Sequence, residues 1–481
     1  MSRCRKPTVL LSAAALAALT GCAPDLGPRP EPMPASAYET AKSLAAPEAA
    51  WPQEAWWTAY GDAELDRLIA VALSDSPDLK MAAARLAAAE GTADVYGSLL
   101  WPTIEGNGTF METEITQNIG FPAMFQPYLP KGFHNAALMT LGMQYQLDLF
   151  GKNRANLQAA LSSAEAAKAE QAEARLQIAA GVAALYATLT QLEADQATAE
   201  DAVTLRGQSA ALMEKRQNAG LENQASLSQA RALQEAAKVR VEAVKAVSTR
   251  VRHALAALLG KGPDYGLAIT VTRAHPLHTA GLPEKLAADL IGRRPDVVAA
   301  RRNAEGAAHG IDAANANFYP NIDITGLYGQ GTLDAKYLLN SSSEMAGIGP
   351  AIHLPIFDYG RNTGIYRASR AKYDAAVALY DKTLSNALRD VADAYANRKA
   401  LESELTHARR ALADSENAYR VIRTRYDAGL ARYLDVLAVE DKLLAQRMAV
   451  ADFEAQAFAY DIALVRALGG GYSAGGYAEK K

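Results

Sequence analysis

Cysteine and histidine are scarce in this chain. Of its 481 residues, two are cysteine and seven are histidine. The spacings that hold zinc, such as His-Glu-x-x-His or paired Cys-x-x-Cys, do not occur, and neither does the Gly-x-x-x-x-Gly-Lys-Ser/Thr loop that holds phosphates. These absences argue against the common metal-dependent and nucleotide-dependent enzymes. We therefore expect a protein that is not an enzyme and uses no cofactor.

A basic surface is also missing. The formal net charge is −4, from 49 Lys and Arg against 53 Asp and Glu, and the basic residues form no run. Binding to nucleic acid depends on clustered positive charge. We therefore expect no nucleic-acid partner. Aromatic residues make up only 7% of the chain, and the long alanine-rich segments favour closely packed helices over a bulky aromatic core.

Proline is absent between Pro130 and Pro263 and again after Pro355. Proline interrupts a helix because it lacks an N–H group and its ring clashes with the preceding turn. The two proline-free stretches therefore predict long helices, which we place at residues 151–219, 222–260, 360–428 and 432–468. At ~1.5 Å per residue, the longer ones would reach roughly 100 Å if unbroken. Such lengths exceed the core of an ordinary globular domain.

The second half of the chain repeats the first. Pro77 and Pro102 are 25 residues apart, and so are Pro295 and Pro320, with similar residues around each proline. Further motifs recur at an offset of 209, including Ala-Gly-Leu at Gly220 and again at Gly429. A repeat of this size is far longer than a solenoid repeat. We predict two large structural repeats, residues 51–274 and 275–472, followed by a tail at 473–481.

Heptad spacing supports pairing of the predicted helices. Leu401, Leu405, Ala408 and Leu412 alternate steps of four and three, and a second series begins at Leu437, with polar Asp441 in one of its apolar positions. This pattern is typical of coiled coils. An isolated coiled-coil rod would show the same pattern, so the helices alone do not define the function.

Four segments of about ten residues alternate between apolar and polar side chains. They are residues 102–111, 139–148, 321–330 and 347–356. This period of two predicts strands, and their length suits a tilted transmembrane strand. Because open sheet edges are not tolerated in lipid, four strands cannot form a barrel alone, whereas three chains would supply twelve. A soluble sheet with one wet face is the alternative.

The first 21 residues have the features of a signal peptide. Arg3, Arg5 and Lys6 precede an apolar stretch at 9–19 that is too short to span a bilayer. Leu19-Thr20-Gly21-Cys22 then resembles the lipobox of bacterial lipoproteins, which implies cleavage before Cys22 and acylation of that residue. An ordinary signal peptide with a chance cysteine is the alternative. We expect residues 22–50 to be a lipidated N-terminus and an extended, proline-rich tether.

Taken together, the motifs resemble those of the TolC-like outer membrane factors, in particular the lipoprotein (NodT-type) subunits of resistance-nodulation-division efflux systems. The resemblance covers Trp51 to Tyr472. Its carriers, besides Cys22, are Arg293-Arg294-Pro295-Asp296, Gly349-Pro350, Leu354-Pro355-Ile356-Phe357, Arg425-Tyr426-Asp427-Ala428-Gly429-Leu430 and Ala467-Leu468-Gly469-Gly470-Gly471-Tyr472.

The resemblance implies a mainly α fold that carries a membrane β-barrel. Each chain would be a duplicated helix-hairpin-helix unit, and a homotrimer would build a 12-stranded β-barrel in the outer membrane above a long periplasmic α-helical barrel. The implied function is an outer membrane exit duct that passively exports small molecules. The implied partners are outer membrane lipids, a periplasmic adaptor protein and an inner-membrane pump.

The resemblance also assigns candidate site residues. The helical hairpins would turn at Gly220-Leu221 and Gly429-Leu430, where the adaptor would dock. Tyr426, Arg432 and Asp435 would lie at the periplasmic aperture. Further family positions depart from the pattern and leave the gating links open, because they are Ala431, Ala438 and Ser226.

The sequence leaves two other functions open. A type I protein-secretion duct would share the fold, and a coiled-coil lipoprotein scaffold without a pore would share the heptads and the lipobox. The four amphipathic strands favour a duct over the scaffold. The transported substrate, the particular pump and adaptor, and the resting state of the gate do not follow from the sequence.

Overall fold

The computed structural model describes residues 23–116, 122, 130–271, 281–283 and 286–474. The predicted signal peptide, Cys22 and the end of the tail at 475–481 lie outside these ranges. The chain divides into two compact units. The first comprises residues 1–31, 87–165 and 302–378, and the second comprises residues 32–86, 166–301 and 379–481. Each unit therefore takes segments from both halves of the duplicated sequence.

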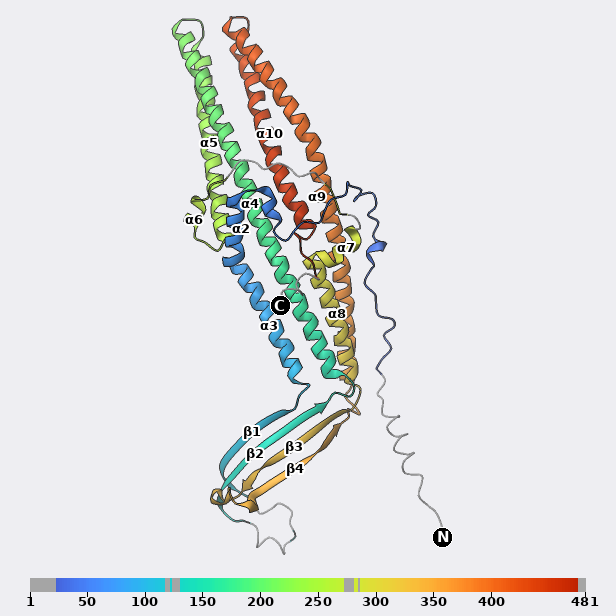
Figure 1. The fold of residues 1–481 in the computed structure, drawn as a ribbon. Coiled ribbons are helices and arrows are strands. Elements are labelled where there is room, and N and C mark those ends of the chain that lie inside the picture. Colours follow the sequence, from blue (N-terminus) through green and yellow to red (C-terminus); the bar gives the residue numbers. More distant parts are fainter. Residues whose placement is uncertain (1–22, 117–121, 123–129, 272–280, 284–285, 475–481) are drawn as a thin grey trace. The chain divides into compact units, whose positions relative to one another are not determined.

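The first unit contains one antiparallel sheet (Figure 1). Its strands lie side by side in chain order, and they are β1 (Thr103–Glu114), β2 (Phe133–Leu147), β3 (Asn321–Thr332) and β4 (Glu344–His353). Strand β2 begins at Phe133, six residues before the start of the segment predicted at 139–148. Strand β4 ends at His353, three residues before the end of the segment predicted at 347–356. Pro355 follows closely after β4, and β4 itself contains Pro350, which an edge strand tolerates.

The register places apolar residues of all four strands on one face. Ile104 pairs with Met143, Met143 with Gly326, and Gly326 with Ile348. Polar Thr103 pairs with Gln144 on the opposite face. Large apolar side chains such as Phe110 and Ile348 are exposed in the single chain. Among the described residues, the sheet thus has an uncovered apolar face and two unpaired edges, β1 and β4.

The described helices of eight residues or more form four pairs between the two repeats, and the pairs match in length except for α2, with 13 residues, and α7, with 8. They are α2 (Ala63–Asp75), α3 (Pro77–Ser98), α4 (Lys152–Asn218), α5 (Gln224–Leu258), α7 (Leu286–Arg293), α8 (Pro295–Ala316), α9 (Arg361–Asp427) and α10 (Tyr433–Ala467). Helices α4 and α9 each have 67 residues, and α5 and α10 each have 35. A five-residue helix, α6 (Pro263–Leu267), follows α5. Among the described residues, no helix has an apolar stretch long enough to cross a membrane.

An aspartate lies in each of the turns that lead from a strand to a long helix. Asp148 accepts backbone hydrogen bonds from Asn153 (3.0 Å) and Arg154 (2.9 Å) at the start of α4. Asp358 accepts them from Gly360 and Asn362, both at 2.9 Å, at the start of α9. A carboxylate at a helix start satisfies free N–H groups and complements the helix dipole. Both repeats therefore use an aspartate at this turn, although it precedes Asn153 by five residues and Asn362 by four.

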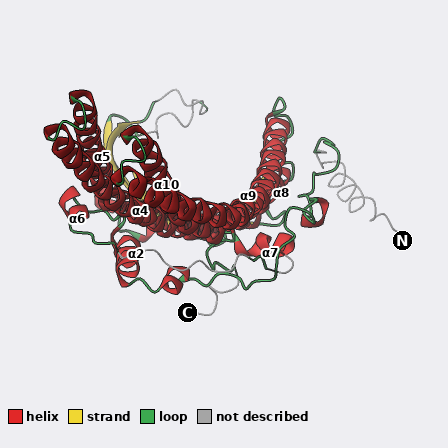
Figure 2. Cartoon of the chain, turned by 90° about the horizontal axis from the view of Figure 1, so that it is seen from above, coloured by secondary structure: helices red, strands yellow, loops and turns green. Residues whose placement is uncertain are grey.

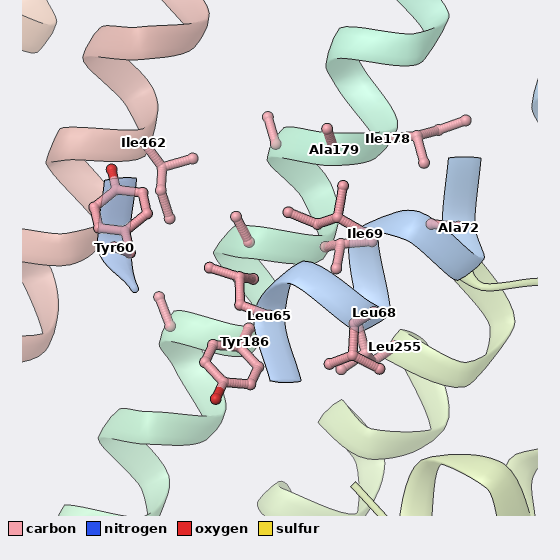
Figure 3. Close-up of a cluster of buried hydrophobic side chains, with 14 of the residues drawn as sticks. Tyr60, Leu65, Leu68, Ile69, Ala72, Ile178, Ala179, Tyr186, Leu255 and Ile462 are labelled. Atoms are coloured by element: carbon pink, nitrogen blue, oxygen red, sulfur yellow. The ribbon is translucent and has the colours of Figure 1, made fainter. Parts of the chain in front are cut away.

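The second unit is held by a helical core. Leu65, Leu68 and Ile69 of α2 are fully buried against α4 and α5 (Figure 3). Two buried carboxylates have tyrosine partners, because the Tyr186 hydroxyl donates to Asp62 (2.6 Å) and the Tyr60 hydroxyl donates to Asp461 (2.9 Å). Burial and the Asp461 carboxylate raise the pKa of Tyr60, so this hydroxyl stays protonated and can donate.

Helix α10 lies between α4 and α9 in the second unit (Figure 2). Phe458 and Ile462 of α10 join the cluster formed with α4, while Leu464 and Ala467 join a cluster with Leu388 and Val391 of α9. Farther along the hairpin, Leu405 of α9 packs with Val450 of α10. The two helical hairpins, α4–α5 and α9–α10, are thus in contact through α10.

Candidate gate at the hairpin tips

Both hairpins turn at a glycine in the left-handed region. Gly220 has φ 67° and Gly429 has φ 75°, values that an L side chain adopts only with strain. The N–H of Leu221 donates to the carbonyl of Arg216, and the N–H of Leu430 donates to the carbonyl of Arg425, both at 2.8 Å. These bonds close the same helix-ending motif in each repeat. They leave Leu221 and Leu430 exposed at the tips.

Tyr426 lies in the contact between the two hairpins. It is 2% exposed and belongs to an apolar cluster with Met213 of α4, Leu227 of α5 and Val436 of α10. Its hydroxyl donates to Sδ of Met213 at 3.7 Å, and the Arg216 guanidinium lies 4.8 Å from the centre of its ring. Burial raises the pKa of Tyr426, which keeps the ring neutral. Tyr426 of the second hairpin therefore packs on the first.

Asp435 and Arg432 lie at the start of α10. Oδ2 of Asp435 accepts the backbone N–H of Arg432 at 2.9 Å, and the two side chains form a salt bridge at 3.6 Å. Both side chains are open to solvent, that of Arg432 to 83%. The carboxylate thus satisfies a free N–H group of the helix start. Within a single chain, Asp435 therefore has a structural role at the start of α10, and this role does not depend on an aperture.

The three positions that depart from the family pattern, Ser226, Ala431 and Ala438, make contacts only with nearby residues or are exposed. Ser226 donates through both its N–H (2.9 Å) and its hydroxyl (3.3 Å) to Asn223, so it belongs to the start of α5. Ala431 packs at the edge of the Tyr426 cluster. Ala438 is exposed on α10. None of these three side chains makes an ionic link between the hairpins.

Charged residues meet between the hairpins at a different place. Arg206 of α4 forms a salt bridge at 3.0 Å with Glu440 of α10 and a second one with Asp441. Glu440 is completely buried, and Arg206 is 5% exposed. The Ser209 hydroxyl donates to the other oxygen of Glu440 at 3.3 Å. Sequence reasoning missed this group, and the one available signal was the polar Asp441 in an apolar heptad series.

The Arg293-Arg294-Pro295-Asp296 motif forms a second polar centre. The Arg294 guanidinium binds Asp296 at 2.6 Å and Asp390 of α9 at 3.5 Å, and it donates to the carbonyl of Ala467 at 3.2 Å. Ala467 is the last residue of α10. Neighbouring Arg293 stacks over the ring of Trp51 at 4.8 Å. The motif therefore joins the start of α8 to α9 and to the C-terminal end of α10.

No group of three potential metal ligands occurs within the described ranges. The Gly-x-Ser-x-Gly spacing of serine hydrolases occurs once, at residues 471–475, where it follows helix α10. The nucleophile of such enzymes lies instead on a turn from a strand to a helix. The position of this motif therefore does not support a hydrolase.

Comparison with known proteins identifies the family. The outer membrane efflux protein family matches residues 68–261 and 286–470. This chain belongs to that family. It is 34% identical over 385 residues to the fusaric acid resistance protein FusA of Burkholderia cepacia, covering 76% of this chain and 71% of FusA. It is 30% identical over 443 residues to the multidrug resistance outer membrane protein MdtP of Escherichia coli O6:H1, covering 90% and 89%.

Solved structures agree with this assignment. The outer membrane protein VceC of Vibrio cholerae superposes with a TM-score of 0.83 at 36% sequence identity, covering 88% of this chain and 100% of VceC. The CmeC outer membrane channel of Campylobacter jejuni gives a TM-score of 0.85 at 21% identity, covering 94% and 95%, which supports the fold. The protein has the fold of the TolC-like outer membrane factors and acts as the outer membrane exit duct of an efflux system.

Proposed function

We propose that the working form of this duct is a homotrimer with a 12-stranded barrel. The sheet of one chain carries the proposal, since it has an exposed apolar face and unpaired edges at β1 and β4. Lipid cannot satisfy the hydrogen-bonding groups of an open edge, so β4 of one chain must pair with β1 of the next. Three chains of four strands give an even number within the range of known outer membrane barrels.

The test is the native mass of the protein extracted from outer membranes in mild detergent, corrected for bound detergent. We expect the mass of three mature chains. A monomer would leave the strand edges open and contradict the pore. In that case the coiled-coil lipoprotein scaffold would become the better explanation of the heptads.

We further propose that the trimer is anchored through acylated Cys22. The segment that follows this residue supports a membrane-proximal anchor, because it is held against the first unit. Arg29 forms a salt bridge with Asp312 at 3.0 Å, and the Tyr373 hydroxyl donates to the carbonyl of Pro30 at 2.9 Å. Tyr373 lies in the fourth turn of α9, which follows β4 in the chain. A Cys22→Ala variant tested by radiolabelled palmitate should carry no label, whereas persistent label would reject this anchor.

The partners in this proposal are a periplasmic adaptor and an inner-membrane pump of the resistance-nodulation-division class. The tips at Gly220-Leu221 and Gly429-Leu430 support adaptor docking, because each presents an exposed leucine after a glycine with positive φ. Tyr426, Arg432 and Asp435 are the proposed aperture residues. The sequence alone also left open a type I secretion system, which would supply a secretion ATPase in place of the pump. Co-purification of an adaptor with an efflux pump, rather than with a secretion ATPase, would decide between the two.

The substrate class remains broad in this proposal. The related proteins are named for resistance to fusaric acid, for multidrug resistance and, in CusC of Escherichia coli, for cation efflux. A passive duct imposes little chemical selection, so we assign substrate choice to the pump and the adaptor. Export of small molecules through this duct is tested by drug susceptibility of a deletion strain that is complemented with the intact chain.

A further inference from the structure

We propose that Trp101 of each chain packs against Phe357 and Tyr359 of the neighbouring copy, at the junction where β4 meets β1. We call these three side chains the aromatic contact. In the single chain they are 73%, 84% and 92% exposed, respectively. The inference rests on the proposed trimer, and it adds a binding site that is complete only when two copies of this chain meet.

The two repeats correspond residue for residue at the helical end of the sheet. Helices α3 and α8 have 22 residues each, strands β1 and β3 have 12 each, and both pairs are separated by 218 positions. Helices α4 and α9 are separated by 209 positions. The same separations relate two hydrogen bonds. Nδ2 of Asn153 donates to the carbonyl of Leu99 at 3.3 Å. Nδ2 of Asn362 donates to the carbonyl of Asn317 at 3.1 Å. The starts of the long helices are therefore anchored to equivalent positions in both repeats.

Within one chain, two aromatic residues at this end of the sheet stack on each other. Phe150 follows β2 and Tyr319 precedes β3, and the centres of their rings lie 4.7 Å apart with an angle of 15° between the ring planes. Tyr319 corresponds to Trp101 through the separation of 218 positions. Phe150 corresponds to Tyr359 through the separation of 209 positions, and each directly precedes a glycine with positive φ. The stack thus flanks the β2–β3 junction, where the two repeats of one chain join.

The junction between β4 and β1 of the next copy is the counterpart of the β2–β3 junction. Thr103 of β1 pairs with Gln144 of β2, and the corresponding residues of the second repeat, Asn321 and His353, also pair. The two hairpins therefore have the same register. When β4 pairs with the next β1, the residues after β4 meet the residues before β1. Strands β1 and β4 lie at opposite edges of the sheet (Figure 1), so this contact has to form between two copies.

The neighbouring copy would cover a surface whose counterpart is already covered within the chain. Phe150 is 46% exposed with Tyr319 stacked on it, whereas Tyr359 is 92% exposed. Phe357 enlarges the exposed surface, because its ring lies edge-on at 6.3 Å from that of Tyr359. Aromatic pairs favour separations of about 4.5–7 Å between ring centres. Trp101 of the next copy, brought to this place by strand pairing, therefore has two rings on which to pack.

The turn that carries Tyr359 is held in a strained conformation. Tyr359 has φ 52°, in the left-handed region that an aromatic residue rarely adopts, whereas Phe150 does not have a positive φ. The Asp358 carboxylate accepts the N–H groups of Gly360 and Asn362, both at 2.9 Å, and so fixes the backbone around Tyr359. Residues held in strained conformations cluster at functional sites. The strain therefore supports a contact role for this exposed ring.

The first experiment is site-specific cross-linking of the protein in outer membranes. Trp101→Cys and Tyr359→Cys are combined in one chain and treated with a short bifunctional thiol reagent, and the denatured chains are then separated by electrophoresis. We expect covalent dimers and trimers to make up most of the protein. Phe150→Cys with Tyr319→Cys is the calibrating pair, because these residues stack within one chain. It should lose its thiols to the reagent and remain monomeric on the gel.

Leu339→Cys combined with Trp101→Cys is the matched control. Leu339 is 84% exposed but lies between β3 and β4, at the other end of the strands, so this pair should give no covalent oligomers. If chains with Tyr359→Cys fail to assemble, Phe357→Cys takes its place, since the two rings are neighbours.

The native mass of each preparation separates failure of the contact from failure of the duct. Trimers whose calibrating pair reacts, but in which Trp101→Cys and Tyr359→Cys stay unlinked, would overturn the aromatic contact and leave the trimer intact. Monomers of the unmodified protein would reject the trimer and the contact together.

A double-mutant cycle separates contact between copies from contact with lipid. Trp101→Ala and Tyr359→Ala should each lower the temperature at which trimers dissociate by about 5 °C, and the double variant should fall little further than either. Rings that only insert into lipid would act independently and give additive shifts, which would reject the proposal. Tyr359→Phe keeps the ring and should dissociate at the temperature of the unmodified trimer.

Discussion

Arg294 at the start of α8 donates a hydrogen bond to the last carbonyl of α10, that of Ala467, across 3.2 Å. The same guanidinium binds Asp296 and Asp390. A cation at the C-terminal end of a helix complements the helix dipole and satisfies a free carbonyl. One side chain thus fixes where the long second hairpin ends.

Replacing Arg294 should destabilise the helical unit. Arg294→Met would leave Asp390 and the carbonyl of Ala467 without this partner, and we expect a loss of about 2–4 kcal/mol in the free energy of unfolding. The measurement is thermal unfolding of detergent-solubilised trimers followed by circular dichroism. Arg389→Met is the control, because Arg389 contacts the same Asp390 at 2.8 Å but is 62% exposed. Its effect should be much smaller because an exposed ion pair contributes little to stability, and equal losses would refute a special role for Arg294.

Tyr426 should act through its ring rather than through its hydroxyl. Tyr426→Ala leaves a cavity between the hairpins and should cost about 3–5 kcal/mol, with a rise in conductance. Tyr426→Phe keeps the ring and loses only the weak contact with the Met213 sulfur. It should therefore behave almost like the unmodified protein in conductance and melting temperature. An equally leaky Tyr426→Phe would show instead that the hydroxyl bond holds the gate.

The tip at Gly429 offers a test of adaptor docking. We expect Gly429→Glu to abolish drug resistance while trimers still form, because the new charge disturbs both the left-handed turn and the proposed contact surface. Gly360→Glu is the control, since Gly360 also has a positive φ, 83°, and nothing lies within 4 Å of an added Cβ, but it stands at the start of α9. Full resistance in Gly429→Glu, measured by minimum inhibitory concentration, would exclude docking at this tip.

Asp435 is expected to favour cations at the aperture. Three copies at a narrow mouth would attract cations and repel anions, so Asp435→Ala should lower cation selectivity. The measurement is the reversal potential across a bilayer in a tenfold salt gradient. Asp427→Ala serves as the comparison, because Asp427 is also partly exposed and close to the turn. An unchanged reversal potential in Asp435→Ala would leave Asp435 with its role at the start of α10.

Local patterns in the sequence come close to the elements observed. The predicted helix at 360–428 corresponds to Arg361–Asp427, since the absence of proline and the heptads are properties of neighbouring residues. In the same way, the alternation of apolar and polar residues predicts a strand at 102–111, where the structure has β1 at Thr103–Glu114. Strand ends were less accurate. The start of β2 at Phe133 lies six residues before the prediction, because polar Asn135 and small Ala136 and Ala137 break the alternation.

Contacts between distant residues could not be predicted in this way. Nothing near Arg206 in the sequence indicates a buried ion pair, and Glu440 has the polar character of an ordinary surface position. The partner is known only when the two hairpins are placed together. Resemblance to the family named Tyr426, which lies in the contact between the hairpins, and it also named positions at which this chain has alanine or serine.

The uncovered sheet also has a consequence for biogenesis. A newly exported chain carries an apolar face and two free strand edges through the aqueous periplasm before it meets other copies. Such edges pair readily with any extended chain and promote aggregation. The helical unit has its own buried core and needs no partner to begin folding. We therefore expect the helices to form before the strands and strand closure to wait for three chains at the membrane, so that overexpression without chaperones yields aggregates joined through β1 and β4.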